Sequence, residues 1–225
     1  MTLGQLALEL PHRPGFSYDD LLLAPSNEEA AMWIDRWPDW PGHALALHGP
    51  EGCGKTHLAH VWQEATGARV IDGRDLDTPG IVARLEPGQC VALENFPAGG
   101  SEVTLFHLFN WTKEQGGYLL LTGRQPPARW DVQLKDLRSR LRGLHAVALG
   151  APDDAMLRAI LVKLFADRQL IVSEEILNYL LTRIERTFVG AEAAVRAIDR
   201  LALAEKRRIT VPLARVALEE GGRQL

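Results

Sequence analysis

The segment Gly49–Thr56, which reads GPEGCGKT, restricts the fold of this chain more than any other part of its sequence. It fits the pattern G-x-x-x-x-G-K-[ST], in which glycines let successive backbone N–H groups converge on an anion in front of a helix N-terminus. A short apolar run over residues 43–48 precedes the segment, and apolar side chains recur at helical spacing over residues 55–66 after it. The order of strand, glycine-rich loop and helix predicts a phosphate-binding loop and a nucleotide ligand.

The same pattern gives roles to individual side chains of the loop. Lys55 is expected to reach the β- and γ-phosphates of a bound nucleotide, and the Thr56 hydroxyl to hold a magnesium ion. Cys53 is interpreted as a small filler rather than a redox group. The residues of the loop and of the following helix start that are expected to contact the nucleotide are Gly49, Pro50, Glu51, Gly52, Cys53, Gly54, Lys55, Thr56 and His57.

A carboxylate for the metal ion follows a second apolar run. Glu94 ends the run over residues 90–94 and is expected to hold magnesium together with Thr56, directly or through water. Glutamate stands here instead of the more usual aspartate, and the next residue, where hydrolysing proteins often carry a carboxylate, is Asn95. Because an amide cannot act as a general base at neutral pH, the sequence predicts nucleotide binding and leaves autonomous hydrolysis open. An ordinary strand-end carboxylate is the alternative interpretation of Glu94.

Apolar runs of four to six residues alternate with amphipathic segments through the first 150 residues. Strands are predicted over residues 43–48, 69–72, 89–93, 118–122 and 145–149. This alternation favours an α/β architecture, with a parallel sheet covered by helices on both faces. After Gly150, helices are predicted over residues 153–167, 173–186, 190–205 and 211–218. We therefore expect a tail over residues 1–13, an αβα nucleotide-binding domain over 14–150 and a small all-helical domain over 151–225.

Charge and cysteine content exclude several classes of protein. The chain has 225 residues with 25 basic and 29 acidic side chains, a formal net charge of −4, which argues against a generally basic nucleic-acid binder. Its 2 cysteines exclude a disulfide-stapled scaffold and fit a reducing compartment. Because the sequence has neither a signal-peptide pattern nor an apolar run of about 20 residues, we expect a cytoplasmic protein without a membrane partner.

Six basic residues are concentrated between positions 124 and 142, where only two acidic residues oppose them. They are Arg124, Arg129, Lys135, Arg138, Arg140 and Arg142. Such a cluster indicates either a negatively charged partner or a solvated helix face, and composition alone does not decide between them.

Three further segments resemble the AAA+ module of the DnaA-related replication proteins. Phe16–Asp20 with Ser26-Asn27 is similar to the segment that opens this module. Leu119–Pro127 is similar to its strand that ends in a polar sensor residue before a proline pair, and Asp136–Leu141 to its L-x-S-R segment. The similarity extends over about residues 14–220. It implies a three-layer αβα domain with a parallel five-stranded sheet, followed by a helical lid, and ADP or ATP with Mg²⁺ as cofactors.

The resemblance assigns roles to residues outside the phosphate-binding loop. Arg140 matches the arginine finger, which would act on the ATP of a neighbouring subunit in trans. Thr122 matches the sensor residue that positions water. Tyr18, Leu22 and Leu23 are expected to contact the adenine base.

Alternatives and one departure accompany these roles. Arg140 is also compatible with a basic helix end that pairs with nearby acids, and Thr122 with a hydroxyl that bonds the backbone. Val189 stands where the family places a sensor arginine in the lid. The lid is therefore expected to distinguish ATP from ADP poorly.

The architecture is similar to that of the Hda-type members of this family, which lack a DNA-reading helix-turn-helix domain after the lid. Gln5–Leu10 resembles the peptide by which Hda-type proteins bind the sliding clamp, although a leucine-rich start without function is the alternative. The clamp-binding residues would be Gln5, Leu6, Leu8 and Leu10. The implied partners are DnaA, the β-subunit sliding clamp of DNA polymerase III and a second copy of this chain. DNA contact would be indirect, and the location nucleoid- or replisome-associated.

The resemblance implies a clamp-tethered regulator of chromosome replication initiation, which stimulates ATP hydrolysis by DnaA and so prevents re-initiation. Three other functions stay open. The first is a DnaA-like ATPase or a helicase-loader-type motor, and the second is a nucleotide-stabilised adaptor for DnaA without catalysis in trans. The third is a direct DNA binder that uses residues 124–142.

Overall fold

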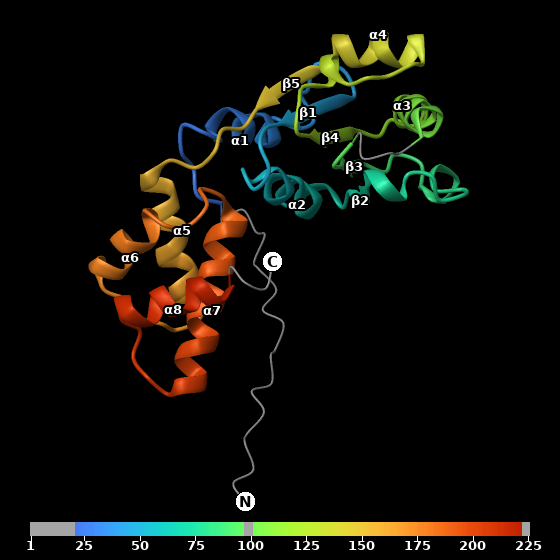
Figure 1. Cartoon of the computed structure of the whole chain (residues 1–225). Coiled ribbons are helices and arrows are strands. Elements are labelled where there is room, and N and C mark those ends of the chain that lie inside the picture. Colours follow the sequence, from blue (N-terminus) through green and yellow to red (C-terminus); the bar gives the residue numbers. More distant parts are fainter. Residues whose placement is uncertain (1–20, 97–100, 222–225) are drawn as a thin grey trace, which may run out of the picture.

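The chain folds into an αβα unit and a helical unit that lie side by side (Figure 1). The structure is a computed structural model and describes residues 21–96 and 101–221. The sequence-based expectations for Tyr18 and for the clamp-binding residues Gln5, Leu6, Leu8 and Leu10 fall outside the described residues.

Five parallel strands form the central sheet, which confirms the predicted α/β architecture. They are β1 (Ala44–His48), β2 (Arg69–Asp72), β3 (Val91–Glu94), β4 (Leu119–Gly123) and β5 (His145–Ala148). Their order across the sheet is β2-β3-β4-β1-β5. Since all carboxyl ends of a parallel sheet meet at one edge, Asp72 and Glu94 lie in register there, and His48 lies beside Gly123. The phosphate-binding loop therefore leaves the sheet between β4 and β5, at the edge where ligands of open α/β sheets bind.

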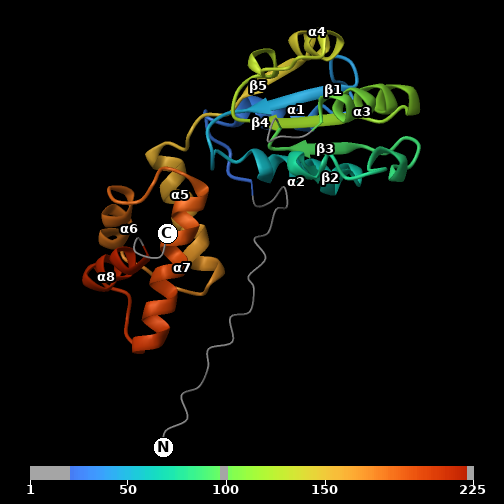
Figure 2. The same cartoon turned by 45° about the vertical axis from the view of Figure 1, so that its right-hand side comes forward.

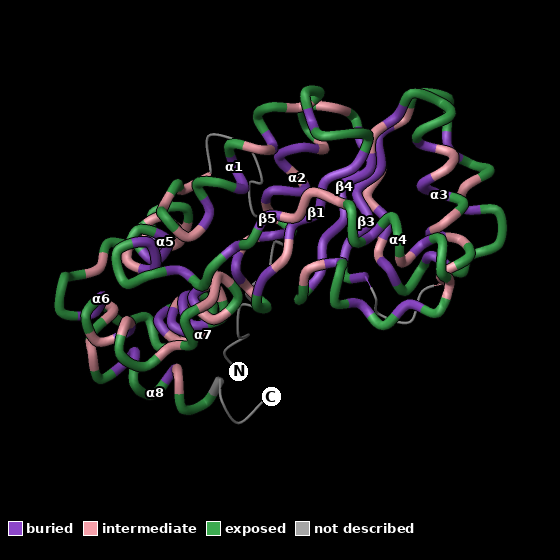
Figure 3. The backbone as a smooth tube through the Cα atoms, turned by 90° about the horizontal axis from the view of Figure 1, so that it is seen from above, coloured by how far each residue is buried: buried purple, intermediate pink, exposed green. Residues whose placement is uncertain are grey.

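Alternate strand residues point into two separate cores. The helices of this unit are α1 (Glu28–Asp35), α2 (Lys55–Thr66), α3 (Glu102–Gln115) and α4 (Lys135–Gly143), with short 3₁₀ helices η2 (Gly73–Asp75), η3 (Val82–Arg84) and η4 (Pro127–Arg129). Leu45 and Leu47 belong to the core of α1 and α2, whereas Ala44 and Ala46 belong to that of α3 and α4. Figure 2 shows α2 and α4 on opposite sides of the sheet, and Figure 3 shows the central strands β1, β3 and β4 as a mostly buried band. Burial on both faces explains why these central strands read as continuous apolar runs.

Four helices form the second unit, the lid, around a core of their own. They are α5 (Asp154–Asp167), α6 (Glu174–Leu181), α7 (Phe188–Glu205) and α8 (Val211–Gly221). α6 ends at Leu181, five residues before its predicted end, because the chain then turns toward the phosphate-binding loop. α7 begins two residues earlier than predicted, because the Thr187 hydroxyl accepts a hydrogen bond from the Gly190 N–H and caps the helix. Within residues 21–96 and 101–221, no helix combines the length and the apolar character needed to cross a bilayer.

The segment that precedes α1 joins the two units. Leu21 packs against the core of α1 and α2, whereas Leu22 and Ala24 pack against the core of the lid. The Gly150 N–H donates a 2.9 Å hydrogen bond to the Ser26 carbonyl and ties this segment to the connection between β5 and α5. The segment before α1 and the connection from β5 to α5 therefore lie together, near the carboxyl end of β5.

Replacing Asp153 with alanine should destabilise the lid. Its carboxylate accepts a 2.7 Å hydrogen bond from the Met156 N–H at the start of α5, and loss of such a cap costs about 1 kcal/mol. Ser173→Ala is the matched control, because Ser173 occupies the N-cap of α6 without a side-chain capping bond. Urea unfolding followed by circular dichroism should show the larger loss of unfolding free energy for Asp153→Ala. Equal losses would contradict this assignment.

Candidate nucleotide-binding site

The loop between β1 and α2 has the backbone that the phosphate-binding pattern requires. Gly52 and Gly54 adopt φ angles of +70° and +100°, which L-residues with side chains rarely adopt. A Cβ on Gly49 would lie 2.2 Å from the Leu149 carbonyl oxygen, so that this position also excludes a side chain. The loop is thereby fixed against the end of β5 and leads directly into α2 at Lys55.

The Lys55 ammonium group lies inside this loop. The residue is 8% exposed, and its Nζ donates hydrogen bonds to the Gly49 carbonyl at 2.9 Å and the Pro50 carbonyl at 2.7 Å. Cys53 is 2% exposed with its Sγ 3.6 Å from the same nitrogen, a placement that fits its interpretation as a filler. Since its hydrogen-bond partners within the described part of the chain are neutral groups, this buried ammonium is the charge that phosphate oxygens would bind.

A pocket of about 440 Å³ opens between the loop and the lid. Seven of the residues expected from the sequence line it, namely Leu22, Glu51, Gly52, Gly54, Lys55, Thr56 and His57. The other three residues of the loop, Gly49, Pro50 and Cys53, do not line the pocket. Leu23 is 59% exposed and also lies outside the lining.

The lid supplies a wall of the pocket, in part through residues to which the sequence analysis gave no role. Asn95 and Arg124 line the pocket from the αβα unit, and the lid contributes Ile160, Lys163, Leu164, Asp167, Phe188, Val189 and Glu192. Four of them recur at helical spacing along α5, from Ile160 to Asp167. This periodicity is visible in the sequence, but it does not tell which flank of an amphipathic helix faces a pocket.

The start of α7 docks directly on the phosphate-binding loop. The Phe188 N–H donates a 3.1 Å hydrogen bond to the Gly52 carbonyl. A Cβ on Gly52 would lie 2.5 Å from the Thr187 Cβ, and one on Gly54 would lie 3.4 Å from the Phe188 ring. The glycines therefore make room for the lid as well as for a phosphate. Val189 lines the pocket with 63% of its surface exposed and supplies no cation there.

Glu94 has the properties of a metal ligand. It is 8% exposed, and its Oε1 is buried without a hydrogen-bond partner among the described residues. A buried carboxylate oxygen of this kind is costly unless a cation or a donor reaches it. The carboxylate of Glu94 and the hydroxyl of Thr56 are the hard oxygen ligands that Mg²⁺ prefers, so the residues present fit this ion.

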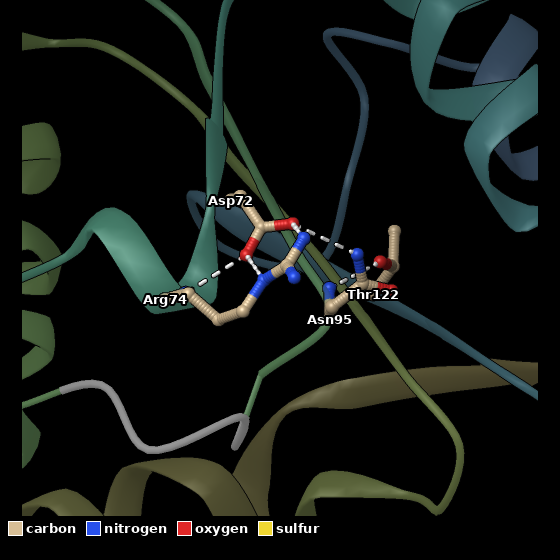
Figure 4. Close-up of polar contacts among 4 residues, drawn as sticks. All are labelled: Asp72, Arg74, Asn95 and Thr122. Atoms are coloured by element: carbon tan, nitrogen blue, oxygen red, sulfur yellow. Dashed lines mark hydrogen bonds and ion pairs between the residues drawn. The ribbon is translucent and has the colours of Figure 1, made fainter.

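A hydrogen-bonded network surrounds Asn95, the residue after Glu94 (Figure 4). The Asn95 backbone has a φ of +59°, its N–H donates to the Thr122 Oγ1 at 3.1 Å, and its Nδ2 donates to the Asp72 Oδ2 at 3.2 Å. Thr122 is 1% exposed, and its hydroxyl accepts the hydrogen bond from the Asn95 backbone N–H, as the alternative interpretation of this residue expects. Its role as a sensor stays a prediction.

Arg74 holds the other member of this network. Its Nε and Nη2 lie 2.8 and 3.0 Å from the two carboxylate oxygens of Asp72. The hydrogen bonds from this guanidinium hold the pKa of Asp72 far below its usual range. Asp72 is therefore ionised at neutral pH and accepts hydrogen bonds without donating any.

The basic cluster divides into side chains with different surroundings. Arg138 donates through Nε to the Val132 carbonyl at 2.8 Å and supports the turn before α4. Arg124 lines the pocket and forms an ion pair with Glu51 of the loop. Arg140 is exposed on α4, with its guanidinium 4.7 Å from the centre of the Phe106 ring. Arg140 does not line the pocket of its own chain.

The comparisons with known proteins agree with this geometry. Residues 154–218 match the family model described as "Hda, lid domain". Domain III of the Thermotoga maritima replication initiation protein DnaA superposes with a TM-score of 0.79 and 17% identity, covering 92% of this chain and 97% of that chain. AMPPCP-bound DnaA from Aquifex aeolicus has a TM-score of 0.65 at 19% identity, with coverage of 83% and 66%.

A motor protein has the same fold. The Thermotoga maritima RuvB Holliday junction branch migration motor has a TM-score of 0.71 and 19% identity, with coverage of 91% of this chain and 72% of that chain. At these identities the solved structures show the fold alone, an αβα domain followed by a helical unit. The family match concerns the helical unit alone, residues 154–218, which is similar to the Hda lid domain.

Lys55→Ala should weaken nucleotide binding. The variant removes the ammonium that phosphate oxygens would bind, and hydrogen bonds to charged groups are worth about 1.5–3 kcal/mol, roughly a 10- to 100-fold change in affinity. Isothermal titration calorimetry with ADP and with ATP measures the effect. Lys135→Ala, at an exposed position on α4 outside the pocket, is the control and should bind as the unaltered chain does. Equal affinities for the two variants would exclude Lys55 as a phosphate ligand.

Proposed function

We propose that this Hda-type, DnaA-related AAA+ protein binds ADP or ATP with Mg²⁺ and regulates chromosome replication initiation by presenting Arg140 to ATP bound by DnaA. The result would be stimulated hydrolysis by DnaA and prevention of re-initiation. The observation that carries this proposal is the position of Arg140, exposed on α4 and outside the pocket of its own chain.

The pocket supports the nucleotide part of the proposal. A polar end at Lys55 and Thr56 suits phosphates, and an apolar end at Leu22, Ile160 and Leu164 suits an adenine base. The Aquifex aeolicus DnaA structure of the same fold contains AMPPCP, which has the size and charge of ATP. Bound Mg²⁺ would neutralise charge on the phosphate oxygens, and Thr56 and Glu94 are the side chains that would hold it.

Arg140 suits action on a second molecule. Among the described residues no carboxylate pairs with its guanidinium, and its one ring contact, with Phe106, leaves the N–H donors at the ring edge available. A guanidinium placed on the γ-phosphate neutralises the charge that develops during phosphoryl transfer, which is worth roughly 10³–10⁵-fold in rate. The open donors and the exposed position favour an arginine finger over a helix end that pairs with nearby acids.

Two pocket residues favour action in trans over rapid hydrolysis of the chain's own nucleotide. Asn95 supplies an amide where a general base would be needed, and Val189 supplies no cation from the lid. Thr122 would place water from the end of β4. These features suit a protein that retains its nucleotide and acts on that of DnaA.

The clamp tether extends the proposal to residues outside the described structure. Gln5, Leu6, Leu8 and Leu10 would bind the β-subunit sliding clamp of DNA polymerase III as an extended peptide, with glutamine as the polar anchor and leucines in an apolar groove. This contact would bring the protein to the replisome and the nucleoid, and its link to DNA would be indirect.

Arg140→Ala should abolish stimulation of DnaA. We expect the stimulated rate of ATP hydrolysis, measured with both proteins and with clamp loaded on DNA, to fall on the order of 10³-fold toward that of DnaA alone. Affinity of the variant for ADP and for the clamp should be unchanged, because Arg140 lies outside the pocket. Unchanged stimulation would sink the mechanism.

Arg142→Ala is the matched control for this experiment. It removes the same charge from an exposed position on the same helix, two residues away. Stimulation that falls equally in both variants would point to general charge attraction instead of a finger. ATP turnover by the chain alone that is lost in Glu94→Gln would favour the autonomous ATPase or motor, and nucleotide-dependent DnaA binding without stimulation would favour the adaptor.

The double substitution Gln5→Ala with Leu6→Ala should remove clamp binding. It deletes both the polar anchor and one apolar contact of a short peptide, which has few contacts to lose. Surface plasmon resonance on immobilised clamp measures the loss, with Lys135→Ala as an unaffected control. Nucleotide affinity should stay the same, and persistent clamp binding would show that the tether lies elsewhere.

A further inference from the structure

The carboxylate of Asp72 is fully engaged at the end of β2. Its Oδ1 accepts hydrogen bonds from the backbone N–H of Arg74 at 2.9 Å and from the Arg74 Nε at 2.8 Å. Its Oδ2 accepts from the Arg74 Nη2 at 3.0 Å and from the Asn95 Nδ2 at 3.2 Å. Asp72 stands in register with Glu94 on the neighbouring strand, and of the four residues in Figure 4 Asn95 is the one that lines the pocket.

This arrangement fixes which way the Asn95 amide faces. An ionised carboxylate only accepts hydrogen bonds, so the NH₂ group of Asn95 must face Asp72 and the amide oxygen must point away from it within the amide plane. The Asn95 backbone is held independently by its N–H bond to Thr122 and by the bond from the Phe96 N–H to the Thr122 carbonyl, 3.1 Å. Asn95 lines the pocket, and its amide oxygen, which points away from Asp72, is the atom of the amide group that can accept a hydrogen bond.

We propose that Asp72 is a positioning residue that orients the Asn95 amide toward the nucleotide pocket and disfavours a carboxylate at position 95. A carboxylate there would face the Asp72 oxygen at about the present 3.2 Å contact without a donor between them. Two carboxylates at such a distance cannot both stay ionised without cost. This inference rests on the proposed function in one respect, namely that the pocket holds a nucleoside triphosphate.

The absence of a carboxylate at position 95 is then a property of two residues, and placing one there requires two changes. Asn95→Asp alone introduces a carboxylate that Asp72 repels. Asn95→Asp combined with Asp72→Asn exchanges donor and acceptor in nearly the same volume and keeps the hydrogen bond. In the combined variant the new carboxylate would take a proton from a water molecule while the oxygen of that water bonds to the γ-phosphorus. The bond from the γ-phosphorus to the β–γ bridging oxygen breaks, and that oxygen leaves with ADP.

A double-mutant cycle on the nucleotide-free chain tests the pairing without any enzymatic readout. Asp72→Asn, Asn95→Asp and their combination are compared by melting temperature. We expect each single change to lower Tm by about 2–4 °C, and the combined change to lower it less than the sum of the two. Additive losses would overturn the proposal. Asp77→Asn, at an exposed position in the same connection after β2, is the control and should leave Tm unchanged.

A second readout follows the orientation itself and then its consequence. The Asn95 side-chain NH₂ resonances should shift in Asp72→Asn and not in Asp77→Asn, and unshifted resonances would overturn the proposal. In single-turnover ATP hydrolysis the combined variant should exceed Asn95→Asp by roughly 10²-fold. Equal rates in the two variants would also overturn it. Loss of Arg140-dependent stimulation would bear on the proposed function alone, because the melting-temperature cycle involves neither DnaA nor nucleotide.

Discussion

The glycine loop between β1 and α2 is the constraint on which the sheet, the nucleotide pocket and the lid all depend. At Gly49 the loop passes so close to the Leu149 carbonyl that a side chain does not fit, and at Gly52 the lid takes up the same space. The hydrogen bond from Phe188 to the Gly52 carbonyl then joins α7 to the loop. A movement of the lid would therefore shift the backbone that would hold the phosphates directly, because the contact joins backbone to backbone.

Cations in this acidic chain are separated by their surroundings. Lys55 is buried among loop carbonyls, Arg124 pairs with Glu51 at the mouth of the pocket, and Arg140 is exposed with only a ring beside it. Near the loop, burial and the positive charges of Arg129 and Lys55 lower the pKa of His48, so that this side chain adds no further charge at neutral pH. A net charge of −4 thus coexists with two local cations that we propose to meet phosphate, one buried and one exposed.

The strands, the phosphate-binding loop and the helical lid could be predicted from local sequence patterns. Burial on both faces of a parallel sheet produces apolar runs, and the loop requires glycines at fixed spacing. Contacts between distant segments left no such pattern. Phe188 reaches Gly52 from the other unit, and Ile160 and Leu164 form a pocket wall only because α5 lies against the loop. Asn95 was identified as a missing base, but its bond to Asp72 depends on the pairing of β2 with β3.

That pairing changes what the asparagine means. If the asparagine at position 95 were a carboxylate replaced without consequence, no neighbouring residue would make a contact that requires an amide. Instead Arg74 keeps Asp72 ionised, and the Asp72 Oδ2 also accepts a hydrogen bond from the Asn95 NH₂ group. Asn95 itself adopts a left-handed backbone conformation, which asparagine tolerates better than most residues. Position 95 is therefore specified as a donor on one side and an acceptor on the other. Such a site would hold water by hydrogen bonding without taking its proton, which agrees with our proposal that the arginine of this protein acts on a neighbour's nucleotide.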